Sequence, residues 1–172
     1  MATISRAAQA DVMIREFMPG DEIAFRRLNE EWIVRHFGSL EGRDEEIVCN
    51  PQRIILDGGG RIFFAVVRGE VIGCCALIAA GRGEYEVAKM AVTQSAQGLG
   101  IGRRLLESVI AGARTSGARS LHLETNRKLT PAIGLYESVG FQHLPPERFA
   151  PSPYTRCNVQ MELHLNDPQP SR

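Results

Sequence analysis

Three glycines stand at alternate positions in the segment Gln97-Gly98-Leu99-Gly100-Ile101-Gly102, between a strand-like run and an amphipathic helical pattern. Glycine has no Cβ, so the backbone of such a loop can bend sharply and approach a ligand closely. The helix that follows presents unpaired N–H groups and a partial positive charge at its first turn. The segment therefore predicts a binding site for a phosphate or diphosphate group.

Three classes of phosphate ligand compete for this loop. A P-loop would continue with Lys and then Ser or Thr, whereas Gly102 is followed by Arg103 and Arg104, which excludes this class. A dinucleotide site needs its third glycine where Arg103 stands, although Glu124 lies where a ribose-binding acid is expected. This alternative, an NAD-dependent oxidoreductase, is further weakened because residues 93–97 put a long loop before the glycines. The third class is the diphosphate of coenzyme A.

Two motifs around the loop favour the third class. The first, Gln or Arg followed by x-x-G-x-Gly/Ala, is matched by Gln97, Gly100 and Gly102. The second, N…A-x-x-L-Y-x-x-x-G-F, is matched by Asn126, Ala132 and Leu135-Tyr136-Glu137-Ser138-Val139-Gly140-Phe141. From about residue 84 to residue 141, the chain resembles the GNAT superfamily of acyl-CoA-dependent N-acetyltransferases. It departs from the family pattern at Gln94, where many members have proline.

This resemblance implies acetyl-CoA as the cosubstrate and no metal ion. The diphosphate would lie on the backbone N–H groups of about Gly98 to Arg103, with the Gln97 side chain as a further donor. The pantetheine arm would run along the strand end at residues 90–92, where the Val92 N–H would polarise the thioester carbonyl. The residues expected to bind the cofactor are Met90, Ala91, Val92, Gln97, Gly98, Leu99, Gly100, Ile101, Gly102, Arg103 and Asn126.

Tyr136 and Glu86 are the expected catalytic residues. The resemblance implies that Tyr136 is the general acid for the departing thiolate, since a positioned phenol can pass a proton to sulfur. Helical spacing alone favours packing of Tyr136 on the inner face of its helix. Glu86 matches a position that is often acidic in the family, and strand alternation puts it on the face of Met90 and Val92. It would accept the amine's proton or hold a cationic substrate; the alternative is a solvated carboxylate at the start of a strand.

The acceptor is expected to be an amine of a small molecule or of a peptide. Folds of this family wall the acceptor pocket with the first two helices and C-terminal loops, which makes Trp32, His36 and Tyr154 weaker candidates. Trp32 lies on an apolar helical stripe and is expected in the core. Glu124 is expected to be structural. A non-catalytic acyl-CoA-binding sensor or interaction module would keep the same loop, and it is the alternative to an enzyme.

The composition narrows the partners and the compartment. Twenty basic residues balance twenty acidic ones, so no overall field favours nucleic acid or an acidic membrane surface. No apolar run approaches the roughly 20 residues of a membrane span, and the first dozen residues lack the apolar segment of a secretory signal. We therefore expect a cytoplasmic protein without nucleic-acid or membrane partners. The oligomeric state stays open, with a homodimer as one alternative. The four cysteines form no C-x-x-C pair and are expected to be buried free thiols.

Apolar periodicity and turn residues predict the elements that must position these groups. Strands are expected at residues 12–17, 61–68, 71–79, 85–92, 121–125, 141–144 and 157–165. Helices are expected at residues 21–37, weakly at 44–56 around Pro51, and at 101–113 and 132–139. Gly69-Glu70 is expected to be the two-residue turn of a hairpin.

This order predicts a single acetyltransferase domain at residues 12–165, with a flexible lead-in at 1–11 and a frayed tail at 166–172. A helix connects the strand that ends at Val92 to the strand that starts near Leu121, so these two strands must be parallel. The expected fold class is mixed α/β and GNAT-like. Its central sheet would be mostly antiparallel, with one parallel strand pair and helices on its faces.

Overall fold

The structure is a computed structural model that describes residues 11–165 of the 172-residue chain. The predicted tail and residues 1–10 of the predicted lead-in lie outside the described residues. Seven strands form one sheet in the order β1-β2-β3-β4-β5-β7-β6. The strands are β1 Met13–Glu16, β2 Arg61–Val67, β3 Glu70–Gly81, β4 Glu84–Val92, β5 Ser120–Thr125, β6 Gln142–His143 and β7 Val159–His164.

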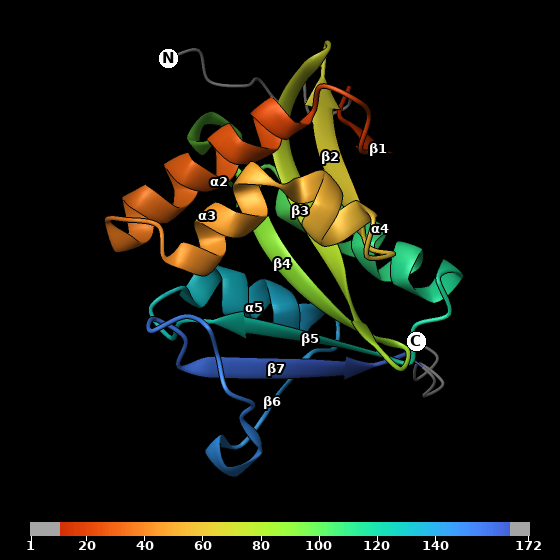
Figure 1. Ribbon diagram of the computed structural model, residues 1–172. Coiled ribbons are helices and arrows are strands. Elements are labelled where there is room, and N and C mark those ends of the chain that lie inside the picture. The colour runs from red at the N-terminus through yellow and green to blue at the C-terminus, as the bar shows by residue number, and fades with distance from the viewer. Residues whose placement is uncertain (1–10, 166–172) are drawn as a thin grey trace.

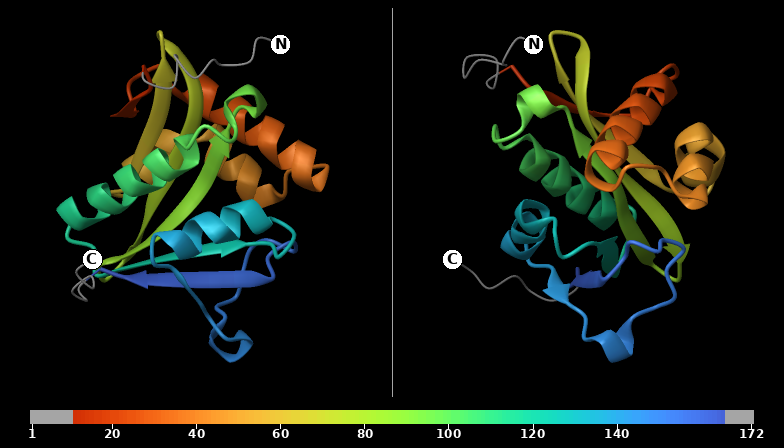
Figure 2. Two further views of the ribbon diagram at one scale, coloured as in Figure 1. Left: turned by 180° about the vertical axis from the view of Figure 1, so that it is seen from behind. Right: turned by 90° about the vertical axis from the view of Figure 1, so that its left-hand side faces the viewer.

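Helices cover both faces of this sheet (Figure 1). They are α2 Glu22–Phe37, α3 Gly42–Cys49, α4 Ile101–Thr115 and α5 Thr130–Ser138, with short helical turns at Gln52–Leu56, Gln94–Ala96 and Pro146–Arg148. Figure 2 shows α2 and α3 on one face and α4 and α5 on the other. None of the helices in residues 11–165 is both long and apolar enough to cross a membrane.

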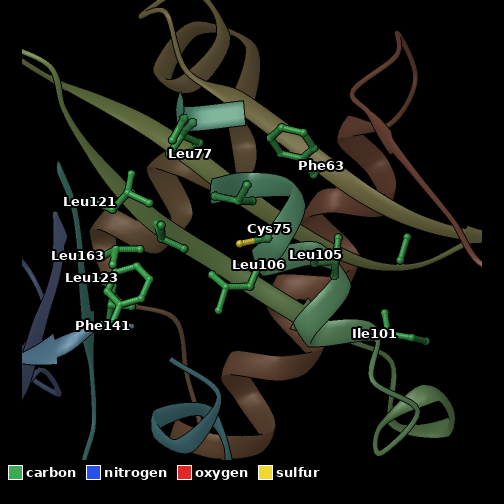
Figure 3. Packing of buried hydrophobic residues seen from close by; sticks show 14 of the residues in the cluster. Phe63, Cys75, Leu77, Ile101, Leu105, Leu106, Leu121, Leu123, Phe141 and Leu163 are labelled. Carbon is green, nitrogen blue, oxygen red and sulfur yellow. The ribbon is translucent and has the colours of Figure 1, made fainter. Parts of the chain in front are cut away.

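The core has two layers, one on each face of the sheet. Leu105 and Leu106 of α4 are fully buried, and Figure 3 shows them directed at sheet residues such as Cys75. Cys74, the preceding residue, lies in the other layer with Phe25 of α2. Adjacent strand residues point to opposite faces, so this pair of cysteines joins both layers, as predicted. The fold class is confirmed: a mixed sheet flanked by helices.

Several predicted boundaries are wrong for identifiable reasons. The hairpin turn is Arg68-Gly69, not Gly69-Glu70, because Glu70 pairs with Val67 in the ladder. Both turn residues have positive φ, at 50° and 83°, as a type I′ turn requires. The predicted helix at 44–56 is two helices, because α3 ends before Pro51 and a separate turn starts at Gln52.

The cysteine prediction also needs a correction. Cys74 and Cys75 are buried free thiols, but Cys49 is exposed and Cys157 is only partly buried. Cys49 is the last residue of α3, where the helix end faces solvent, and Cys157 lies in the loop before β7. Neither position is inside a layer of the core.

The parallel pair of strands creates the main opening of the fold. β4 pairs with β5 only where Glu84–Glu86 lie beside Ser120–His122. Beyond this short ladder the two strands separate, and Figure 1 shows them diverging from a common end. The backbone groups of β4 that face β5 therefore lack strand partners from residue 87 onwards.

Candidate active site

A cavity of about 590 Å³ lies where β4 and β5 separate. Its walls come from α2, β4, the glycine loop, the start of α4, the end of β5, α5 and the loop before β7. Most of the predicted site residues line it: Glu86, Met90, Val92, Gln97, Gly98, Gly100, Ile101, Gly102, Arg103, Asn126 and Tyr136. Ala91 and Leu99 do not line it. The structure thus brings together groups that lie up to 50 residues apart in the sequence.

The glycine loop gives the cavity a row of backbone donors. Gly98 and Gly100 have φ values of 76° and 74°, a left-handed conformation that glycine adopts without strain. Gly100 is the N-cap of α4, and its carbonyl accepts the Arg104 N–H at 3.2 Å. The N–H groups of a helix's first turn lie beyond the reach of its own i→i−4 ladder, and here they lie at residues 101–103 of α4. First-turn donors of this kind can hold a diphosphate.

The polar side chains beside the loop already bond to protein groups. Gln97 Nε2 donates to the Val92 carbonyl at 3.3 Å. Arg103 Nη2 donates to Ser138 Oγ at 2.6 Å and thereby links α4 to α5. Asn126 Nδ2 donates to the Arg156 carbonyl at 2.7 Å, and its Oδ1 accepts the Lys128 N–H. All three positions line the cavity, and contact of their side chains with a cofactor remains a prediction.

A β-bulge at Lys89 changes which side chains of β4 face the cavity. Cys74 pairs with Ala91 and Ala76 with Ala88, so β4 has one more residue than β3 between these pairs. The extra residue reverses the alternation of side chains. Met90 and Val92 pack on the α4 side, whereas Ala91 is buried on the α2 side.

This bulge corrects the predicted face of Glu86. Glu86 does not share a face with Met90 and Val92, because strand alternation would hold only in a regular strand. Glu86 shares the face of Ala88, which packs toward α2 and α3. Ala91 lies between Met90 and Val92, and its side chain is buried on the α2 side, so the contact expected of Ala91 with the cofactor stays a prediction.

Backbone N–H groups at the end of β4 point into the gap between β4 and β5. The Thr93 N–H donates to the Ile72 carbonyl of β3 at 2.8 Å. Successive N–H groups of a strand point to opposite sides, so those of Val92 and Met90 point away from β3 and toward the gap beside β5. A carbonyl oxygen bound there would receive a hydrogen bond from the backbone of β4.

Glu86 is the available carboxylate of the site. Within residues 11–165 its side chain has no hydrogen bond or ion pair, and burial raises its pKa against the opposing charges of Lys89 and Arg43. Glu124 differs, because it accepts hydrogen bonds from Ser152 Oγ at 2.8 Å and Gln160 Nε2 at 3.4 Å. Burial also raises the pKa of Glu124, with a smaller contribution from the charge of Glu86.

Tyr136 packs on the inner face of its helix and also lines the cavity, while its role as a general acid stays a prediction. Its ring packs edge-on against Phe141, with centroids 6.0 Å apart, and it contacts the core layer under α4. It also lines the cavity, and its hydroxyl makes no hydrogen bond within the described part of the chain. Burial raises the pKa of the phenol well above its ordinary value, so the group keeps its proton at neutral pH.

Lys89 and Arg156, which line the cavity, belong to a buried ionic network that was not predicted from the sequence. Asp44 is fully buried and accepts hydrogen bonds from Lys89 Nζ at 2.8 Å and Arg156 Nη1 at 2.7 Å. Burial alone would raise the pKa of Asp44, but hydrogen bonds from Arg156 and the charge of Lys89 outweigh it and lower the pKa to about 2. Lys89 Nζ also donates to the Tyr154 hydroxyl at 2.9 Å. A lysine inside the apolar run of β4 was the one sequence signal for this network.

Aromatic rings line the wall that α2 and the C-terminal loop share. Trp32 stacks on His36 at 4.3 Å between centroids, and both line the cavity with Tyr154. The expectation that Trp32 belongs to the core is therefore wrong: it is partly buried against the edge of the core and faces the cavity. All three weaker acceptor candidates line the same cavity as Glu86.

Comparison with known proteins adds sequence relatives to this geometry. Residues 24–141 match the sequence profile described as "Acetyltransferase (GNAT) family". An uncharacterized N-acetyltransferase of Schizosaccharomyces pombe is 30% identical over 87% of this chain and 91% of its own length. An IAA acetyltransferase of Azospirillum brasilense is 43% identical over 83 residues, which are 46% of this chain and 54% of the relative. The aligned part thus spans about half of that relative.

Solved structures show the same fold at lower identity. A GNAT acetyltransferase of Staphylococcus aureus Mu50 superposes with a TM-score of 0.81 at 20% identity, over 90% of this chain and 99% of that one. An acetyltransferase of Salmonella typhimurium, solved with acetyl-CoA, superposes with a TM-score of 0.71 at 20% identity, over 94% and 98% of the two chains.

Proposed function

The chain belongs to the GNAT family of acetyltransferases, and on that premise we propose how its own residues transfer an acetyl group from acetyl-CoA to an amine. One observation supports the proposal most. The donor N–H groups of the glycine loop, the inward N–H groups of β4, Tyr136 and Glu86 all line one cavity. Thioester aminolysis needs a group for each of these tasks: holding the donor, polarising its carbonyl, protonating the leaving sulfur and deprotonating the amine.

Acetyl-CoA would lie along the opening between β4 and β5. Its diphosphate would accept hydrogen bonds from the first turn of α4, where the helix dipole also favours negative charge. The pantetheine arm would follow β4 beyond its pairing with β5, where, within residues 11–165, the edge of β4 has no neighbouring strand on that side. The acetyl-CoA in the Salmonella structure is consistent with this assignment of the cosubstrate.

The transfer proceeds by direct attack of the amine on the thioester carbonyl. Negative charge develops on the carbonyl oxygen, and the Val92 N–H, aided by that of Met90, stabilises it. The carbon–sulfur bond then breaks, and Tyr136 donates its proton to the departing thiolate. Burial makes the phenolate of Tyr136 unfavourable. The proton that the amine loses must therefore reprotonate Tyr136 promptly.

Glu86 is the proposed base for the acceptor amine. Its raised pKa makes it a stronger base than an exposed glutamate. The acceptor, a small-molecule or peptide amine, would enter between Glu86 and the aromatic side chains of Trp32 and Tyr154. An ammonium group is attracted by both the carboxylate and the ring faces, so this end suits a cationic acceptor before it loses its proton.

Glu86→Gln should lower kcat/KM and remove the limb that the ionisation of Glu86 sets on the acidic side of its pH profile. A base must be deprotonated, so activity in the wild type is lost as pH falls through the raised pKa of Glu86. We expect a loss of about 10²-fold at neutral pH, and the rate of the variant should follow the fraction of unprotonated acceptor amine, so that it keeps rising with pH where the wild type has levelled off above the pKa of Glu86. The matched control is Glu84→Gln, since Glu84 is an exposed residue of the same strand. A variant at Glu86 that retains the wild-type acidic limb would exclude it as the base.

A thiol-release screen over amines tests the proposed activity as a whole. Purified protein with acetyl-CoA should release free CoA thiol only with amines that it acetylates. Binding of acetyl-CoA without thiol release from any amine would favour a sensor module. Stabilisation by NAD and not by CoA would favour the oxidoreductase alternative.

A further inference from the structure

Lys89 has a backbone conformation that is unusual inside a strand. Its φ is 53°, in the left-handed region, which is unfavourable for a residue with a Cβ. The other non-glycine residues of the described chain with positive φ are Arg68 and Arg82, and both lie in hairpin turns. Lys89 instead forms the bulge in the middle of β4.

The charge of Lys89 gives a reason for this conformation. In a regular strand, residue 89 would share the face of Val87, which packs in the apolar layer under α4. An unpaired ammonium group there would lose its hydration without compensation. The bulge turns the side chain to the opposite face, where Asp44 is the partner of its Nζ.

The partners of Lys89 are themselves fixed. The Lys89 side chain is 6% exposed and Asp44 is 0% exposed, so water screens their attraction little. Asp44 receives two further hydrogen bonds from Arg156 and one from the Glu41 N–H. The Tyr154 ring lies 4.8 Å from Lys89 Nζ. One ammonium group thus joins β4 to α3 and to the C-terminal loop.

We propose that Lys89 is a positioning residue for acetyl transfer: its ion pair with Asp44 selects the bulge, and the bulge aims the Met90 and Val92 N–H groups at the thioester carbonyl. The inference rests on the proposed function for what those N–H groups bind. Lys89 acts through the backbone of β4, and it neither donates nor accepts the transferred proton.

Isotope-edited infrared spectroscopy of bound [1-¹³C]acetyl-CoA tests this without turnover. Hydrogen bonds to the thioester oxygen weaken the C=O bond, so its stretching frequency in the wild type should lie below that of free acetyl-CoA. In Lys89→Ala the frequency should return toward the free value. Lys89→Gly should lie between the two, because glycine adopts the bulge conformation without strain but has no side chain to select it.

Kinetics on the best amine of the screen give the second readout. We expect kcat of Lys89→Ala to fall at least about tenfold, as loss of an oxyanion donor would cause, while the Kd of CoA stays within about threefold because the glycine loop is unchanged. Arg68→Ala is the matched control, since it removes an arginine from an exposed left-handed position of a turn, and it should leave both readouts unchanged.

Three results would overturn the proposal. They are a wild-type carbonyl frequency in Lys89→Ala, a parallel loss of kcat and CoA affinity, and a Lys89→Gly variant no closer to wild type than Lys89→Ala. If the alanine variant fails to fold, the glycine variant alone decides: a carbonyl frequency above that of the wild type supports the proposal, and a wild-type frequency overturns it. A wild-type protein that acetylates no amine would contradict the proposed function, and the infrared comparison would still decide the role of Lys89.

Discussion

Tyr136→Phe should lower kcat by about 10²- to 10⁴-fold, the usual contribution of a positioned general acid, with little change in the Kd of acetyl-CoA. The substitution removes one hydroxyl and keeps the ring, so the packing against Phe141 survives. Within residues 11–165 this hydroxyl has no hydrogen bond to lose, and stability should therefore be close to that of the wild type. Steady-state kinetics together with isothermal titration calorimetry separate the two quantities.

The control for this variant is Tyr85→Phe. Tyr85 is a partly buried phenol of β4 that packs in the same apolar layer but does not line the cavity. Its loss of a hydroxyl should leave kcat unchanged. If Tyr136→Phe turns over at the wild-type rate, and a single-turnover experiment confirms that chemistry limits that rate, Tyr136 has no part in the proton transfer.

Asp44→Asn should destabilise the fold by about 3–5 kcal/mol, the usual effect of removing one partner from a buried ion pair. The amide is nearly the same size as the carboxylate, so the loss is electrostatic. Lys89 and Arg156 would then lose the buried carboxylate that both contact, and Arg156 would retain its ion pair with Glu41. Denaturant unfolding at neutral pH measures the difference.

The pH dependence of this difference identifies its cause. The pKa of Asp44 is lowered to about 2 from the ordinary value of 3.8, so its contribution to stability is present above the unfolded value and is lost as pH falls through this window. The linkage corresponds to about 2 kcal/mol at neutral pH. The stability gap between the wild type and Asp44→Asn should be constant above pH 5 and should shrink below about pH 4.

Glu45→Gln is the matched control for Asp44→Asn. Glu45 is the next residue of α3 and is exposed, so its neutralisation should change stability by about 0.5 kcal/mol or less. A variant at Asp44 that is as stable as this control would mean that the network with Lys89 and Arg156 adds no net stability.

The sequence was informative where local pattern determines structure. The apolar face of α4 and the glycine loop before it follow from spacing within about fifteen residues, and both are confirmed. The parallel pairing of β4 with β5 followed from the helix that connects them. These features depend on neighbours along the chain.

The errors arise where a distant contact overrides the local pattern. Alternation placed Glu86 with Met90 and Val92, but Lys89 reverses the alternation to reach Asp44, 45 residues earlier in the chain. Trp32 fits a core stripe by spacing, yet the separation of β4 from β5 leaves a cavity on that side. Neither partner can be identified from a single sequence, because a buried lysine does not indicate which carboxylate neutralises it.

The central claim is that backbone N–H groups of the glycine loop and of β4 bind acetyl-CoA. An NMR titration of the uniformly ¹⁵N-labelled protein with acetyl-CoA tests it most directly, since each amide reports separately. The largest shift changes should fall on Gly98, Gly100, Gly102 and Arg103 and on Met90 and Val92, and an equal concentration of NAD should leave these signals in place. Saturating acetyl-CoA that moves none of these amides, or that moves only amides outside the cavity, would contradict the account.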